Sequence, residues 1–141
     1  DAEPPCVMAS IERIDQLKAR EILVLNDALH ILNEYDKHLN HREQPGFGDA
    51  FYQWALRNRH NSLHCEQVPL EIAGDGSFST FPSVSELTKF DPSNRKFVAT
   101  AHTHPVNNPV INATDKSWHE HLSALGRHGM RVEFICPAEI T

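Results

Sequence analysis

The chain has 141 residues, 40% hydrophobic and 23% charged, which is typical of one globular domain and long enough to bury a single core. A formal net charge of -6, with its 13 Lys and Arg residues scattered along the chain, argues against nucleic acid as a partner. No hydrophobic run approaches the roughly 20 residues that a membrane-spanning helix needs, so no membrane partner is expected either.

The start of the chain and its cysteines bear on where the protein works. The sequence begins at Asp1 without a methionine, which suggests a mature form or an excised domain. Cys6, Cys65 and Cys136 have no CxxC spacing, so they exclude a zinc ribbon and allow at most one disulfide, whose pairing stays open. A secreted or periplasmic location is slightly favoured over the cytoplasm.

The N-terminal third of the chain is predicted to be helical. From Met8 to about Leu39, hydrophobic residues recur at helical intervals without Gly or Pro, so one long amphipathic helix is expected. Residues 41–49 contain two glycines and a proline and predict a loop. Asp49 ends this loop and is a good N-cap for a second helix that reaches about His60.

Short alternating segments, typical of β-strands, follow the second helix. Residues 64–84 surround a Gly-Asp-Gly turn and predict a hairpin or two tightly joined strands. Residues 95–103 predict the next strand, and the two prolines in residues 105–112 predict an irregular loop. Residues 113–129 predict a helix with Gly129 as its C-cap, and residues 130–137 a last strand.

The expected fold class is therefore α/β, with a small mixed sheet flanked by helices and an extra long N-terminal helix. We expect one compact domain overall. Residues 1–45 would form a helical extension that packs on a core of residues 46–141.

His102 and His104 lie at the end of the predicted strand, where a metal site is chemically reasonable. Side chains two residues apart on a strand share one face, with Cα atoms about 6.5 to 7 Å apart, so both imidazoles can bind one cation. Pro105 ends the strand directly afterwards, and Asp115 near the start of the next helix can supply a third ligand. Two histidines and one carboxylate leave the fourth position of a zinc ion open for water, as in catalytic sites.

The same residues also have a purely structural explanation. Asn112 is a good N-cap, and Asp115 three residues later suits the N3 position of the same helix. The capping role and the metal role are compatible, because a carboxylate at the start of a helix can face both.

The spacing of these residues resembles a known motif. AHTHP, followed by six residues, Asn112, two residues and Asp115, resembles the His-x-His-Pro-x6-Ser-x-x-Asp motif of the JAB/MPN metalloproteases, the JAMM family. Every gap matches, and Asn112 stands where the family has serine. The resemblance covers residues 49–137 and implies a cytidine-deaminase-like fold with zinc held by His102, His104 and Asp115.

The family also has a catalytic glutamate where a strand begins, upstream of the histidines. Glu66 is the candidate, and Glu71 is the alternative, five residues on and hence on the opposite face of a regular strand. By the resemblance, zinc would lower the pKa of its water to near 7, and Glu66 would be the general base. Asn112 would take the place of the serine that stabilises the oxyanion.

The resemblance thus implies a zinc-dependent hydrolase of a peptide, isopeptide or related amide bond, with a peptide or protein as substrate. The alternative is a catalytically weak or inactive JAB/MPN-like binding module, as in a bacterial secreted effector or toxin. The sequence leaves the substrate and the oligomeric state open.

Overall fold

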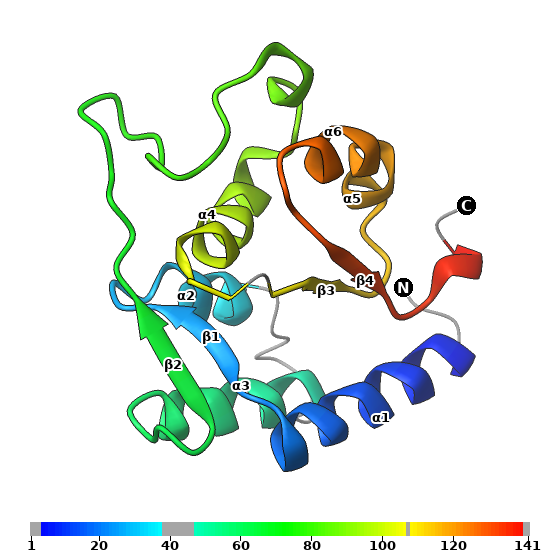
Figure 1. The fold of residues 1–141 in the computed structure, drawn as a ribbon. Helices are drawn as coiled ribbons and strands as arrows, with labels where there is room; N and C mark the ends of the chain where they lie inside the picture. The colour runs from blue at the N-terminus through cyan, green and yellow to red at the C-terminus, as the bar shows by residue number, and fades with distance from the viewer. Residues whose placement is uncertain (1–3, 38–46, 107, 140–141) are drawn as a thin grey trace.

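The computed structural model describes residues 4–37, 47–106 and 108–139 (Figure 1). The helices are α1 (Pro4–Arg20), α2 (His30–Lys37), α3 (Phe47–Asn58), α4 (Arg95–Thr103), α5 (Lys116–Glu120) and α6 (Leu122–Arg127). The strands are β1 (Leu23–Asn26), β2 (Cys65–Val68), β3 (Val110–Asn112) and β4 (Val132–Phe134). Short 3-10 turns occupy Ser85–Leu87, Pro92–Asn94 and Pro137–Glu139. The α/β class is confirmed at this level, and in these ranges no helix is long and apolar enough to cross a membrane.

The strands pair in parallel, two by two. β1 lies beside β2 with Leu23 opposite Cys65, and β3 lies beside β4 with Val110 opposite Val132. The described residues therefore contain two small parallel sheets where the sequence predicted one mixed sheet. The predicted hairpin is reduced to one antiparallel bridge, between Ile72 and Phe78 on either side of the Gly-Asp-Gly turn.

The predicted single helix from Met8 to Leu39 is wrong. α1 ends at Arg20, β1 follows, and α2 begins only at His30, while residues 38 and 39 lie outside the described residues. Residues 22–25 are four apolar residues in succession, a pattern typical of a strand that has other elements packed on both of its faces. Leu29 then adopts a positive φ of 65°, which no helix interior accommodates.

The second helix and its loop are partly described. α3 begins at Phe47 and ends at Asn58, close to the predicted span, with Asp49 in its first turn instead of at the N-cap. Most of the predicted loop of residues 41–49 lies outside the described residues.

The predicted strand at residues 95–103 is also wrong, because this segment forms α4. The helix follows a 3-10 turn that Asp91 caps, its side chain accepting a hydrogen bond from the Ser93 backbone N–H at 2.9 Å, with Pro92 at the first position. An acidic cap followed by proline is a strong helix-start signal. Packing also favours the helix, since Val98, Ala99 and Thr100 are all buried.

The C-terminal elements follow the predictions more closely. β4 lies within the predicted last strand, and the predicted helix of residues 113–129 is present as α5 and α6, with Gly129 just beyond α6 at a φ of 83°. β3 occupies the end of the segment that was predicted to be an irregular loop.

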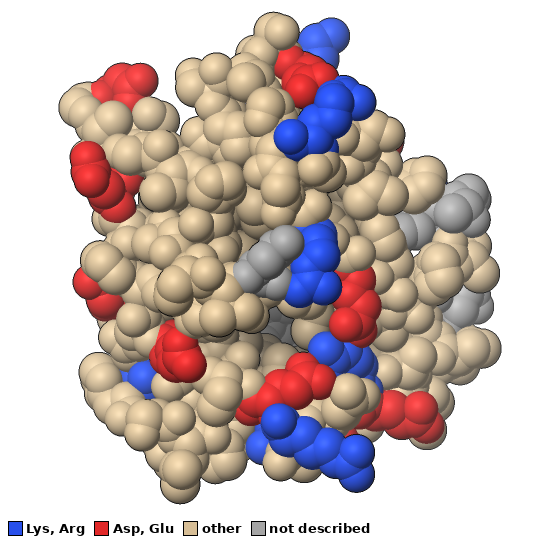
Figure 2. All heavy atoms as spheres, viewed as in Figure 1, with Lys and Arg blue, Asp and Glu red and all other residues tan. Residues whose placement is uncertain are grey.

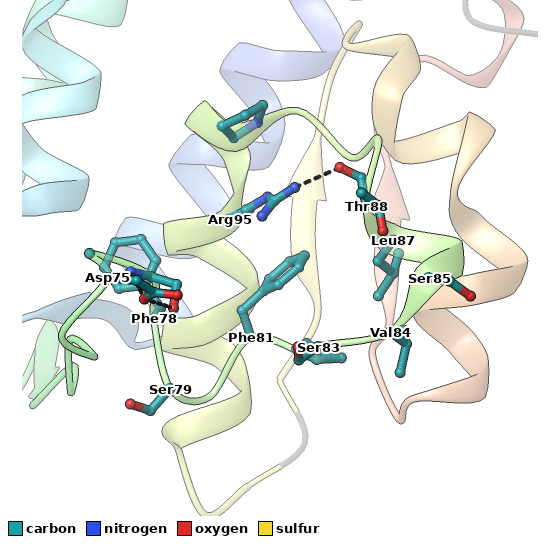
Figure 3. Close-up of a pocket in the computed structure, with 14 residues that line it drawn as sticks. Asp75, Phe78, Ser79, Phe81, Ser83, Val84, Ser85, Leu87, Thr88 and Arg95 are labelled. Carbon is teal, nitrogen blue, oxygen red and sulfur yellow. Dashed lines mark hydrogen bonds between the residues drawn. The ribbon is translucent and has the colours of Figure 1, made fainter.

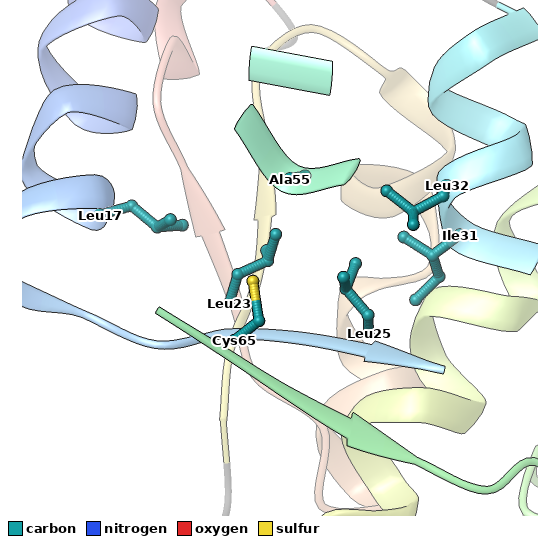
Figure 4. Packing of buried hydrophobic residues seen from close by; sticks show 7 residues of the cluster. All are labelled: Leu17, Leu23, Leu25, Ile31, Leu32, Ala55 and Cys65. Atoms are coloured by element: carbon teal, nitrogen blue, oxygen red, sulfur yellow. The ribbon is translucent and has the colours of Figure 1, made fainter. Parts of the chain in front are cut away.

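Two hydrophobic clusters form the core of the part of the chain that the structure describes. The first lies where α1, β1, α2, α3 and β2 meet and contains Leu17, Leu23, Leu25, Ile31, Leu32, Ala55 and Cys65 (Figure 4). The second lies between α4, α5, α6 and the turns before α4 and contains Leu87, Phe90, Val98, Trp118, Ala124, Leu125 and Met130. Phe97 of α4 packs against both clusters. The N-terminal segment thus supplies a strand and part of the first cluster.

One disulfide joins the two ends of the described chain. Cys6 in α1 is bonded to Cys136 beyond β4, which agrees with the expectation of at most one disulfide. Cys65 is a free cysteine, 3% exposed in the first cluster. Intrachain disulfides are typical of exported proteins.

The buried thiol gives a direct test of this cysteine arrangement. Burial raises the pKa of Cys65, so little thiolate is present at neutral pH, and the side chain is out of reach of reagents. We expect no reaction with Ellman's reagent in the native protein and one thiol per chain after unfolding without reductant. Three thiols after unfolding would contradict the disulfide, and a fast native reaction would contradict the burial of Cys65.

Candidate functional site

The structure brings together two residues that the sequence singled out, Glu66 and His104. The Oε2 atom of Glu66, on the exposed side of β2, lies 2.5 Å from Nε2 of His104, which caps the end of α4. The side chain of Glu66 is 51% exposed and that of His104 is 9% exposed. A solvent-accessible carboxylate is thus held against a largely buried imidazole.

The other ring nitrogen of His104 fixes the position of its proton. Nδ1 lies 3.1 Å from the backbone nitrogen of Val106 and 2.9 Å from Nδ2 of Asn108. A backbone N–H can only donate, so Nδ1 accepts and the ring proton of the neutral imidazole sits on Nε2. The Glu66 carboxylate therefore accepts a hydrogen bond from His104.

His102 lies away from this pair. It belongs to α4. On a helix, side chains two residues apart are rotated by roughly 200° about the axis and lie on nearly opposite sides, whereas on the predicted strand they would share a face. Its ring is exposed, and its Nδ1 lies 3.4 Å from the sulfur of Met130. The expectation that His102 and His104 share one face is therefore wrong in this fold.

Asn112 and Asp115 are brought together in the turn before α5. The buried Asn112 side chain donates to the carbonyl of Asp115 at 3.0 Å and accepts from its backbone N–H at 3.2 Å. Asp115 is the N-cap of α5, with Oδ1 accepting from the Ser117 backbone N–H, whereas Asn112 was the expected cap. Its Oδ2 accepts from Nδ2 of Asn94 at 2.7 Å.

The residues of the predicted zinc site do not fit a three-ligand centre in this arrangement. Among the residues described, no three His, Cys, Asp or Glu side chains are grouped to hold a metal ion. The nitrogen of His104 that faces Glu66 carries the proton, whereas a zinc ligand must present a lone pair there. Both carboxylate oxygens of Asp115 already accept hydrogen bonds.

Two further residues bear on the candidate site. Glu71, the alternative general base, is exposed beside the Ile72–Phe78 bridge, so contact with a histidine favours Glu66. Asn108, which orients His104, was not identified from the sequence. Its position directly before Pro109 is typical of a turn residue and was the available signal.

Many charged side chains elsewhere are matched to one another. Acidic and basic groups are interspersed on the face shown in Figure 2. Arg13 of α1 forms an ion pair with Glu133 of β4 at 2.5 Å, and Lys96 forms one with the buried Glu34. Hydrogen bonds from Arg127 and then His128 lower the pKa of Glu86. Like the contact between Glu66 and His104, these pairs connect elements that are far apart in the sequence.

Comparisons with known proteins do not assign the chain to a family, since no family model, curated protein or solved structure matches it. The features that point to a function are therefore the contact between Glu66 and His104 and the sequence motif that contains His104.

Proposed function

We propose that the chain is a hydrolase of a peptide, isopeptide or related amide bond, with Glu66 and His104 at its reacting centre. The observation that carries this proposal is the 2.5 Å contact between Glu66 Oε2 and His104 Nε2. The glutamate expected to be the general base thereby meets a histidine of the HTHP motif, although 38 residues separate them. Zinc dependence and a JAB/MPN fold are the parts of the proposal that rest on the motif alone.

The two side chains have different roles: Glu66 transfers the proton, and His104 orients Glu66. His104 donates its Nε2 proton in a hydrogen bond that orients the Glu66 carboxylate, and the exposed side of that carboxylate is open to a water molecule. Glu66 takes a proton from this water as the oxygen attacks the carbonyl carbon. The carbon–nitrogen bond then breaks, and the leaving nitrogen receives the proton from Glu66.

The zinc part of the proposal has a structural requirement. On α4, His102 and His104 do not share a face, so binding of one ion by His102, His104 and Asp115 requires another arrangement of these residues. When bound, zinc would supply a water that ionises near neutral pH.

The test replaces the carboxylate of Glu66 by an amide of the same size. Glu66→Gln is expected to lower kcat/KM on fluorogenic peptide or isopeptide substrates at least 100-fold, the lower end of what a positioned general base contributes. Glu71→Gln is the matched control and should retain wild-type activity. No turnover by the wild type on any amide substrate, or full activity in Glu66→Gln, would overturn the proposal.

Zinc is tested separately, by its content per chain. The motif predicts one zinc ion in the wild type and its loss in His102→Ala, His104→Ala and Asp115→Ala. Activity that survives chelation would refute the zinc part and leave the role of Glu66 intact.

A binding module without catalysis is the second candidate. It is favoured by the hydrogen bonds that already occupy Nδ1 of His104 and both carboxylate oxygens of Asp115. Groups so engaged stabilise the fold and are less available to a substrate. In this case Glu66→Gln and His104→Ala would change stability, and the wild type would show no turnover.

A further inference from the structure

A second concave site lies away from Glu66 and His104. A pocket of about 770 Å³ opens between the segment of residues 75–88 and the start of α4 (Figure 3). Neither Glu66 nor His104 is among the described residues that line it. Its volume falls within the range of about 300 to 1,000 Å³ that small-ligand sites occupy.

The segment that forms this pocket is fastened to α4. The Thr80 hydroxyl lies 2.9 Å from the hydroxyl of Thr103 and 3.1 Å from the carbonyl oxygen of Ala99. The Phe81 ring stacks on the fully buried Phe90 ring at 5.9 Å between centroids. The pocket is therefore held in shape by contacts with the helix and with the second hydrophobic cluster.

Arg95, the first residue of α4, has a fixed orientation in this pocket. Its Nη2 donates to the carbonyl oxygens of Thr88 at 2.9 Å and Phe90 at 3.2 Å. Its guanidinium carbon lies 5.0 Å from the centroid of the Phe81 ring, a cation–π contact. These contacts hold the guanidinium at the wall of the pocket without neutralising its charge.

The charge of Arg95 is not matched within the described part of the chain. No carboxylate there forms an ion pair with it, in contrast to Arg13, Lys96 and Arg127. Its Nε is shielded from solvent and has no hydrogen-bond acceptor among these residues. A cation partly withdrawn from water is unfavourable without an anion nearby, so an anionic ligand group would be stabilised here.

The remaining lining adds a negative charge and apolar surface. The carboxylate of Asp75, at the tip of the hairpin, accepts hydrogen bonds from the backbone and hydroxyl of Ser77, which lower its pKa and keep it ionised. Phe78 and Phe81 supply aromatic walls. A simple anion would therefore be repelled by Asp75. A zwitterion, in contrast, can place its carboxylate near Arg95 and its ammonium group near Asp75.

We propose that this pocket binds short peptides with free termini, whose carboxylate meets Arg95 and whose apolar side chain packs against Phe81 and Phe78. The amino end of the peptide is drawn toward Asp75. This inference goes beyond the proposed hydrolysis, because binding here requires neither Glu66 nor His104.

The test is calorimetric titration with the tripeptide Ala-Ala-Phe and with its C-terminal amide. We expect saturable binding of the free tripeptide and at least tenfold weaker binding of the amide, because a charge-assisted hydrogen bond is lost. Arg95→Gln should weaken binding of the free tripeptide at least tenfold. Arg57→Gln is the matched control, because it removes an exposed arginine that lies outside the pocket. It should leave binding of the free tripeptide unchanged.

A second variant keeps the test independent of the structural contacts of Arg95. Ser83 lines the pocket and is exposed, so Ser83→Asp adds a negative charge without disturbing the core and should also weaken binding of the free tripeptide. Equal binding of acid and amide, unchanged binding in Ser83→Asp, or no saturable binding at millimolar peptide would overturn the inference. Binding that persists in Glu66→Gln separates this site from the proposed hydrolysis.

Discussion

Removal of the disulfide between Cys6 and Cys136 is expected to lower the free energy of unfolding by about 5 kcal/mol, the largest change we predict. The bond closes a loop across a sequence separation of 130 residues, so its loss releases a large amount of chain entropy in the unfolded state. Domains of this kind have about 5 to 15 kcal/mol of stability in total, so reduction should bring the chain close to unfolding.

Urea unfolding followed by tryptophan fluorescence, with and without reductant, measures this effect. The double variant Cys6→Ser/Cys136→Ser should reproduce the reduced protein. Cys65→Ala, which keeps the disulfide, should respond to reductant as the wild type does. A midpoint that is unchanged by reductant would show that the bond is absent or that its loop is already ordered in the unfolded chain.

Phe90→Ala is expected to lower the free energy of unfolding by about 3 to 5 kcal/mol, as is usual when a buried aromatic ring is removed. Phe90 has no exposed surface, and its ring lies 5.0 Å from Trp118 and 5.9 Å from Phe81 between centroids. Its removal leaves a cavity in the second cluster that these rings cannot fill without moving.

The matched control for Phe90→Ala is the truncation of an exposed side chain. Leu63 is 77% exposed, so Leu63→Ala should change the free energy of unfolding by about 0.5 kcal/mol or less. Both values come from urea denaturation of the oxidised protein. A cost below about 1 kcal/mol for Phe90→Ala would contradict the close packing of these rings.

The sequence predicted those elements whose start and stop signals are local. The helix near residue 49, the helical segment that ends before Gly129 and the strand within residues 130–137 were all located from hydrophobic spacing and turn residues. It failed where two patterns overlap. Residues 22–25 fit both a helical spacing and a buried strand, and only their pairing with β2 decides between the two.

The segment at residues 95–103 shows why the candidate site was predicted only in part. Its β-branched residues Val98 and Thr100 favour a strand, but the cap at Asp91 and packing in the second cluster favour a helix. This one choice decides whether His102 and His104 point the same way. The contact between Glu66 and His104 depends on how β2 and α4 pack, which sequence spacing does not encode.

Helix α4 carries Arg95 at its first residue and is capped by His104 at its end. At 1.5 Å per residue these two positions are about 13 Å apart along the helix. Helix α4 thus connects the wall of the pocket to the imidazole that orients Glu66. If a ligand at Arg95 shifts α4, His104 shifts with it, and thermodynamic linkage would make the effect on the two affinities reciprocal.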